Sequence, residues 1–169
     1  MKLLLAAGAK ADIPTIKPPA RVRPGGTAPA TPRQDPSGLA PVPDGGPGIP
    51  AIVAAAGVGY GQGYAANDHH HAPDGWMPAV QYLVEELHAD VNARDSNGFT
   101  ALHFAAARGD NAMIRYLVSK GADVKAVARN GMTTVDMANG PVQRISPFLD
   151  TVALLESLGA KNNHKCVSC

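Results

Sequence analysis

The chain has 169 residues, a length that suits one domain, and its 15 lysines and arginines against 14 aspartates and glutamates leave a formal net charge of +1. Because the two signs are interspersed, no nucleic-acid-binding or membrane-binding field follows. No apolar run approaches the ~20 residues of a membrane helix, and the 2 cysteines lie too near the end to staple a core, so the fold does not depend on disulfides.

Residues 1–13 open with three leucines at 3–5 and continue into Gly8-Ala9. This order matches residues 117–122, which predicts the second helix of a repeating unit and its exit. The alternative is the remnant of a signal peptide, although the apolar run is shorter than the ~7–15 residues expected of one. On the repeat interpretation the chain starts in the middle of a unit, and the three leucines lack their partner helix.

Residues 14–43 are dominated by proline and glycine. Proline removes hydrogen-bond donors and glycine costs entropy on folding, so we expect a disordered insertion without a packed core. The alternative is a proline-type docking peptide at residues 29–32.

Residues 44–93 are predicted to form a distorted repeat with an insertion at residues 57–75. Its second helix is expected from about Trp76 to Leu87, followed by one extra residue and by His88 where a glycine is expected. Trp76 is interpreted as a residue that covers its helix under the long loop, with a role as a binding anchor as the alternative.

The insertion at residues 57–75 holds a glycine run and, further on, His69 and His71. A phosphate loop needs a strand before it, a helix after it and usually Lys-Ser/Thr, none of which is found here, so the glycine run predicts a flexible loop. The two histidines could hold zinc or nickel, but neighbouring side chains do not converge easily on one ion. A solvated loop is the expected alternative.

Residues 94–126 contain the clearest unit of the chain: a turn, a short helix, a tight turn and a second helix. Asn97-Gly98 predicts the first turn, Thr100 can cap the first helix, and Gly109 predicts a left-handed helix end. The first helix has a stripe of small apolar residues, and the second has an apolar face made of Met113, Ile114, Leu117 and Val118. Two such thin helices cannot bury their own apolar faces and need copies beside them.

The copies are present at a shift of 33 residues. Ala-Asp-Val-Asn-Ala at residues 89–93 returns as Ala-Asp-Val-Lys-Ala at residues 122–126. Asn-Gly-Phe-Thr at residues 97–100 returns as Asn-Gly-Met-Thr at residues 130–133. Residues 127–161 therefore form the last repeat, with a further insertion around Pro147, and residues 162–169 form a polar tail.

Thr-Ala-Leu-His-Phe-Ala at residues 100–105, the period of 33 residues and the Gly-Ala-Asp exit resemble the ankyrin repeat family, with alanine in place of its proline. The resemblance implies an all-α ankyrin-repeat solenoid of helix-turn-helix repeats with two long loop insertions, which should leave from opposite edges. It also implies that His103 bonds backbone across the repeat turn and has no catalytic part. The expected units are residues 1–13, 14–43, 44–93, 94–126, 127–161 and 162–169.

A non-catalytic protein–protein interaction module follows from the resemblance, with a protein partner on the concave face and no cofactor. Four apolar side chains, Phe99, Phe104, Met132 and Met137, are expected to face solvent, as the core of an interface would. The alternative is that they pack against a missing or mobile segment. The candidate partner-binding residues are Arg94, Ser96, Asn97, Phe99, Phe104, Arg108, Arg129, Met132 and Met137.

Cys166 and Cys169 form a Cys-x-x-Cys pair that could share a metal or act as a redox couple. Structural zinc needs four ligands and a second cysteine pair is absent, while haem attachment needs a histidine directly after the pair. A mobile tail whose thiols merely oxidise is the alternative. The competing function is thus a metal- or redox-cofactor-associated protein that uses His69, His71, Cys166 and Cys169.

The unmatched helix at residues 1–13 carries a further expectation. Repeat stacks need polar caps at their ends, so we expect an isolated chain that is marginally stable or self-associates through this helix. The sequence contains no convincing targeting segment, and the compartment is not predicted.

Overall fold

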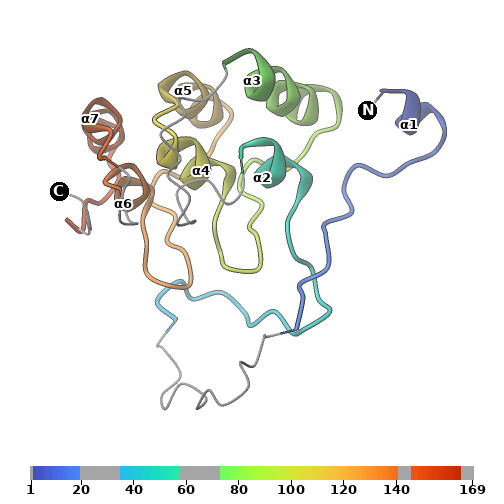
Figure 1. The fold of residues 1–169 in the computed structure, drawn as a ribbon, viewed down its shortest axis with the longest axis horizontal. Coiled ribbons are helices and arrows are strands. Elements are labelled where there is room, and N and C mark those ends of the chain that lie inside the picture. The colour runs from blue at the N-terminus through green and yellow to red at the C-terminus, as the bar shows by residue number, and fades with distance from the viewer. Residues whose placement is uncertain (1, 20–34, 58–72, 141–145, 165–169) are drawn as a thin grey trace.

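The computed structural model describes residues 2–19, 35–57, 73–140 and 146–164 (Figure 1). Within these ranges the chain is mostly helical, and its only β pairing is a set of isolated bridges. None of the helices described there is both long and apolar enough to cross a bilayer. In chain order the helices are α1 (Lys2–Ala6), α2 (Ala51–Ala55), α3 (Pro73–Gln81), the π-helical η1 (Tyr82–Glu86), α4 (Ala101–Ala107), α5 (Asn111–Ser119), α6 (Thr134–Ala138) and α7 (Leu149–Ser157).

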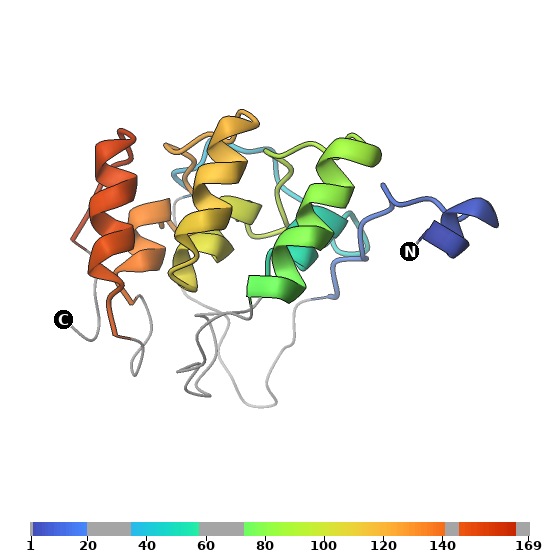
Figure 2. The ribbon, with the colours of Figure 1, turned by 90° about the horizontal axis from the view of Figure 1, so that it is seen from above.

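The helices form two layers. Short α2, α4 and α6 lie in one layer, and the longer α3-η1, α5 and α7 lie in the other (Figures 1 and 2). Helix α4 packs against α2, α5 and α6, and α6 packs against α7. The predicted neighbour relation between the first helices of successive repeats is therefore found for α4 and α6.

Small side chains set the spacing between these layers. Leu102, Ala105 and Ala106 of α4 are fully buried, as are Met113, Ile114 and Leu117 of α5. Alanine lets neighbouring helix backbones approach closely, while the longer side chains of α5 fill the space between the layers. The apolar stripes predicted for both helices are thus confirmed as core.

Turns that extend away from the helices repeat the sequence period. The backbone bridge between Arg94 and Thr100 recurs between Val127 and Thr133, 33 residues later. In the first of these turns Gly98 has φ +84°, a left-handed conformation that glycine adopts without a steric penalty. A third bridge, Ile16 to Pro47, joins the two ends of the proline-glycine stretch.

The extra residue predicted after the helix of residues 76–87 is absorbed by a π-helical turn. The Ala89 amide donates to the carbonyl of Leu83 at 2.9 Å, whereas its counterpart Ala122 donates to Leu117 at 3.0 Å. The first hydrogen bond spans one residue more than the second, which widens the turn at η1. His88, where a glycine was expected, has φ +53°.

Helix α1 lies at the outer end of the row formed by α3, α5 and α7 (Figure 2). Its Leu3 side chain is 87% exposed. Thus an apolar side chain at this end of the row faces solvent.

Candidate partner-binding surface

A continuous row of turn tips runs along the edge of the molecule that faces away from the helix layers (Figure 1). The Arg129 amide donates to Asn97 O at 2.9 Å, and its Nε donates to Ser96 O at 3.1 Å. The Ser96 amide in turn donates to Gly48 O at 2.9 Å. Hydrogen bonds to main-chain carbonyls therefore connect the tips of three successive turns.

Arg94 reinforces the same row from within. Its Nη1 donates to Gly98 O at 2.9 Å, inside its own turn, and to Val127 O at 2.8 Å in the next one. Because both bonds are partly buried, this guanidinium holds two turns in register. Of the predicted tip residues, Asn97 is exposed, and Ser96, Arg94, Arg129 and Met132 are half-buried.

Residues 35–40, called the strap below, lie against these tips. Arg129 Nη1 forms an ion pair with Asp35 Oδ2 at 2.6 Å and donates to Leu39 O at 3.2 Å, while Nη2 donates to Ala40 O at 2.5 Å. The expectation that all of residues 14–43 lacks fixed contacts is therefore too broad. One long guanidinium satisfies three acceptors of a segment about 90 residues away in sequence, a pairing that local composition does not encode.

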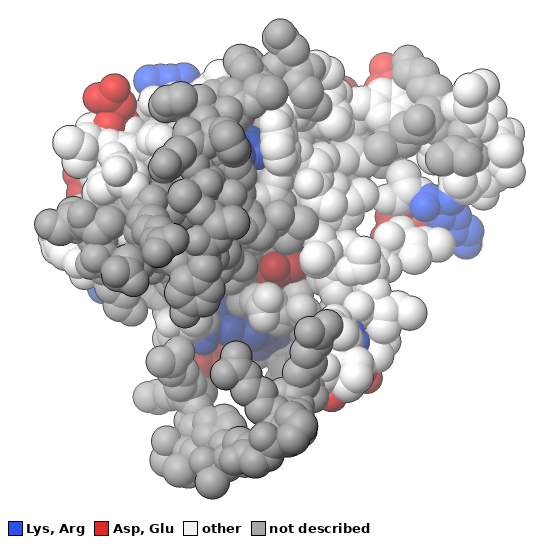
Figure 3. Space-filling view, viewed as in Figure 1, with Lys and Arg blue, Asp and Glu red and all other residues white. Residues whose placement is uncertain are grey.

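The ionisation of Asp35 suits this contact. Hydrogen bonds from the hydroxyl and the amide of Ser37, together with the Arg129 guanidinium, lower the pKa of the Asp35 carboxyl. The strap therefore presents a carboxylate at neutral pH. Acidic and basic atoms are interspersed over the visible described face, which carries no field of a single sign (Figure 3).

Four predicted contact residues are buried instead. Phe99 is 3% exposed, and Phe104, Met137 and Arg108 are 0%, 1% and 1% exposed. The Phe99 ring centroid lies 5.4 Å from that of His103 and 5.6 Å from that of Phe104. The expectation that Phe99, Phe104 and Met137 face solvent is wrong, because these large side chains fill the space that the narrow alanine-rich helices leave.

Arg108, expected at the rim of a binding surface, is part of the core. Its Nη2 forms an ion pair with Asp110 Oδ2 at 3.0 Å, and its Nη1 donates to the carbonyl of Ala56. Its Cζ lies 4.1 Å from the centre of a Trp76 ring. Arg108 thus joins α4 to α2 and α3, and the Trp76 ring lies against a buried cation, a contact that was not predicted from the sequence.

His103 is fully buried, and its Nδ1 accepts the Thr100 amide at 3.1 Å. Burial lowers the pKa of the imidazole to about 4, so the ring is neutral at physiological pH. Its contact with Thr100 lies at the start of α4. The Thr100 hydroxyl also lies 2.9 Å from Nδ1, so the imidazole is held by the residue that precedes α4.

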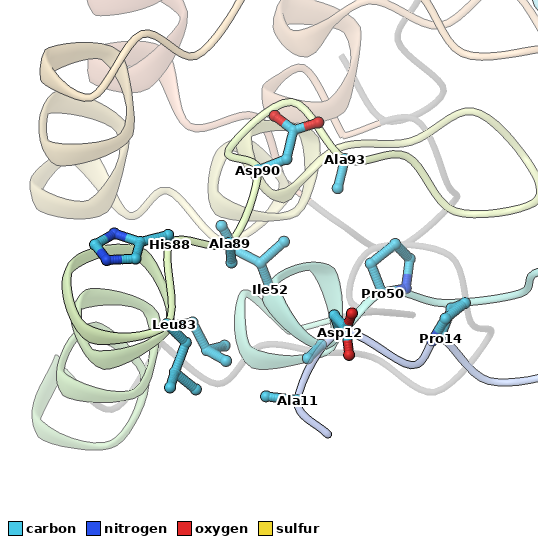
Figure 4. Close-up of a pocket in the computed structure, with 12 residues that line it drawn as sticks. Ala11, Asp12, Pro14, Pro50, Ile52, Leu83, His88, Ala89, Asp90 and Ala93 are labelled. Atoms are coloured by element: carbon cyan, nitrogen blue, oxygen red, sulfur yellow. The ribbon is translucent and has the colours of Figure 1, made fainter. Parts of the chain in front are cut away.

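The open end of the row beside α1 holds a cavity of about 300 Å³ (Figure 4). It lies between residues 11–14, the start of α2 and residues 83–93. Proline, alanine, Ile52 and leucine side chains make most of its wall, and Asp12, His88 and Asp90 also line it. This apolar hollow is on a different side of the molecule from the tips.

The residues of the competing cofactor hypothesis, His69, His71, Cys166 and Cys169, lie outside the described residues, as do residues 29–32. Within the described ranges no group of three or more histidine, cysteine, aspartate or glutamate residues is placed to hold a metal. The cofactor hypothesis stays a prediction. Thiol titration with metal analysis on the purified chain tests it.

Known proteins resemble part of the chain. Residues 64–118 match the family described as "Ankyrin repeats (many copies)". These residues are thus similar to ankyrin repeats. The assignment agrees with the period and the motif at residues 100–105, and ankyrin repeats imply a protein–protein interaction module.

Several curated ankyrin proteins resemble the chain over part of its length. "Ankyrin repeat and SAM domain-containing protein 6" of Rattus norvegicus is 37% identical over 100 residues, which cover 56% of this chain and 11% of that protein. "BCL-6 corepressor-like protein 1" of Homo sapiens is 36% identical over 86 residues, 51% of this chain and 4% of that protein. "Alpha-latrocrustotoxin-Lt1a" of Latrodectus tredecimguttatus is 39% identical over 64 residues, 38% of this chain and 4% of that protein. The matched stretch is thus about a tenth or less of each of these proteins.

Sequence reasoning found the tips of the ankyrin turns but missed the strap. Asp35-Pro36-Ser37 is a local turn pattern, and the Ser37 amide does donate to Asp35 Oδ1 at 2.9 Å. That signal predicts a turn within the insertion. It contains nothing about Arg129, which lies in the last repeat.

Proposed function

We propose that this chain is a non-catalytic ankyrin-repeat module that binds a protein partner through its concave side, with the turn tips as the main contact. Its architecture is an ankyrin solenoid of one half repeat at residues 1–13 and three fuller repeats at residues 44–93, 94–126 and 127–161. Residues 14–43 and 57–75 are its long insertions. The stacked helix pairs and the tip-to-tip hydrogen bonds support this architecture.

The observation that carries the proposal is the rigid row of tips. Arg129 and Arg94 bond to main-chain carbonyls of neighbouring turns, so side chains on the row are ordered before a partner arrives. Binding by pre-ordered groups loses less conformational entropy on association. The proposed contact residues are Ser96, Asn97, Arg129 and Met132, with Arg94 at the rim.

The buried members of the predicted set have a different part in this proposal. Phe99, Phe104, Met137 and Arg108 support the tips from the core and do not touch the partner. Substitution of any of them would weaken binding only through loss of folding.

Affinity capture with quantitative mass spectrometry tests the proposal. We expect proteins captured by the full chain to be lost with Asn97→Arg, which places a large charged side chain on an exposed tip. Arg115→Ala, at an exposed position of α5 in the other layer, is the matched control and should capture normally. Equal capture by both variants, with unchanged circular dichroism, would contradict the tip surface.

The open end beside α1 supports a second proposed contact, with another copy of the chain. Leu3 of α1 is 87% exposed, and an apolar hollow lies at the same end of the helix row, between residues 11–14, the start of α2 and residues 83–93 (Figure 4). Self-association would bury both.

A further inference from the structure

The strap makes the contacts that a bound peptide makes. The Arg129 guanidinium donates to one carboxylate of the strap, that of Asp35, and to two of the strap's main-chain carbonyls, those of Leu39 and Ala40. The Leu39 side chain enters a gap at Gly98, where an added β-carbon would lie 3.1 Å from Leu39 Cδ1. Main-chain carbonyls are present in every peptide, so Asp35 and Leu39 are the two side chains that give this contact its selectivity.

The surface beneath the strap is formed without it. The Arg129 amide and Nε are bonded to Asn97 O and Ser96 O of the neighbouring turn. These bonds fix the guanidinium while its Nη1 and Nη2 point outward to the strap. If the strap left, the same two donors and the same gap at Gly98 would face solvent.

The strap itself is held at few points. Asp35 and Ala40 are exposed and Leu39 is half-buried. The chain beyond it has a separate anchor, because Lys17 Nζ donates to Val42 O at 2.5 Å and pairs with Asp44 at 3.3 Å. Residues 35–40 can therefore lift from the tips while the base of the insertion stays in place.

We propose that the tips bind a peptide of a partner protein that carries an acidic residue four positions before a leucine, with a turn between the two, and that residues 35–40 are an internal copy of that ligand. This inference rests on the proposed function, and it adds the chemistry of the partner and a competitor built into the chain. Covalent connection gives the strap a high effective concentration. The partner peptide binds in proportion to the fraction of molecules whose strap is open.

Fluorescence anisotropy tests the internal-ligand model. The probe is a labelled synthetic peptide of residues 35–43 with blocked ends, titrated with the full chain and with the full-length double variant Asp35→Ala/Leu39→Ala. The double variant opens the strap, and we expect it to bind the probe at least about tenfold more tightly than the unmodified chain. Equal affinities, or no binding to either protein, would overturn the inference.

A second set of probe titrations tests the role of Arg129. In the double-variant background, Arg129→Lys keeps the charge but loses the fork of donors, so the probe should bind about tenfold or more weakly. Arg115→Ala in the same background should leave probe affinity unchanged. A probe with asparagine for Asp35 and alanine for Leu39 should bind as weakly as the Arg129→Lys protein does. Tight binding of the probe that does not change with Arg129→Lys would overturn the inference.

Thermal melting of every variant shows that weak binding does not come from unfolding. The failure of this inference differs from the failure of the proposed function. If Asn97→Arg abolishes capture of a protein partner but the probe never binds, the tips bind a partner and the strap is not a copy of its ligand. If capture is also indifferent to Asn97→Arg, the proposed function fails as well.

Discussion

At the scale of single residues, the fold depends on two polar side chains enclosed in an apolar stack. Arg108 is 1% exposed and His103 is fully buried. The first is paired with Asp110 and lies against a tryptophan ring, and the second is neutral because burial lowers the pKa of its imidazole to about 4. Burial has opposite consequences for the two groups, since a charge is tolerated in the core only when it is paired.

His103 makes stability depend on pH. Its pKa is about 4 in the folded chain and 6.5 in an ordinary environment, so the unfolded chain binds more protons between these values. The contribution is fully present above about pH 6.5 and is lost as pH falls towards about 4, by on the order of 3 kcal/mol. Urea unfolding at pH 7.5 and pH 5 measures it. His103→Gln should be less stable at pH 7.5 with a flatter pH dependence, and an unchanged slope would contradict this origin.

Removal of the Arg108 guanidinium should be costly. Arg108→Met leaves the Asp110 carboxylate buried beside an apolar chain, and we expect a loss of about 3–5 kcal/mol in the free energy of unfolding. Asp110→Asn in the same chain keeps an acceptor for the Met113 amide and removes the charge, so the double variant should recover part of the loss. Chemical denaturation of both variants is the measurement. A loss below about 1 kcal/mol for Arg108→Met would exclude a buried ion pair.

At the scale of elements, each outer helix must end so that the chain can return to the next turn. Helix α5 does this with Gly121 at φ +92°. The helix of the preceding repeat has one residue more and no glycine at its end, so it widens into η1 and places His88 in the left-handed region at φ +53°. A β-carbon in that conformation meets the following carbonyl oxygen, and the helix end is strained.

His88→Gly should relieve that strain. His88 is exposed and its backbone is already left-handed, so we expect the free energy of unfolding to rise by about 1 kcal/mol. Thermal or urea unfolding measures the change. His88→Ala is the matched control because it removes the imidazole and keeps the β-carbon. A gain of the same size in both variants would assign the effect to the imidazole and not to the backbone.

At the scale of the whole molecule, the two ends of the helix row differ. At the α7 end Leu149 is 72% exposed and borders a cavity, and at the α1 end Leu3 is 87% exposed. Ends of a stacked array lack the neighbour that buries each interior face. The two ends differ in polarity: the hollow at the α1 end has a mostly apolar lining, whereas the cavity beside Leu149 at the α7 end has a more polar one.

Leu3→Glu should therefore prevent self-association. Burial of one leucine contributes roughly 1.5–3 kcal/mol, enough to shift a weak dimer markedly. In sedimentation velocity we expect a concentration-dependent species for the unmodified chain, and a monomer for Leu3→Glu. Leu149→Glu at the other end should still associate. A well-folded monomer at all concentrations for the unmodified chain would refute the proposed contact.

The sequence alone determined the repeat period, the turn at Asn97-Gly98, the left-handed Gly109 and the apolar faces of α4 and α5. These features depend on a few neighbouring residues, because turn chemistry and helical periodicity are local. The tertiary structure alone decided that Phe99 and Arg108 are buried and that Arg129 binds a strap about 90 residues away. Burial and long-range pairing depend on the space that remains between the helices after they pack. No single stretch of the chain encodes the shape of that space.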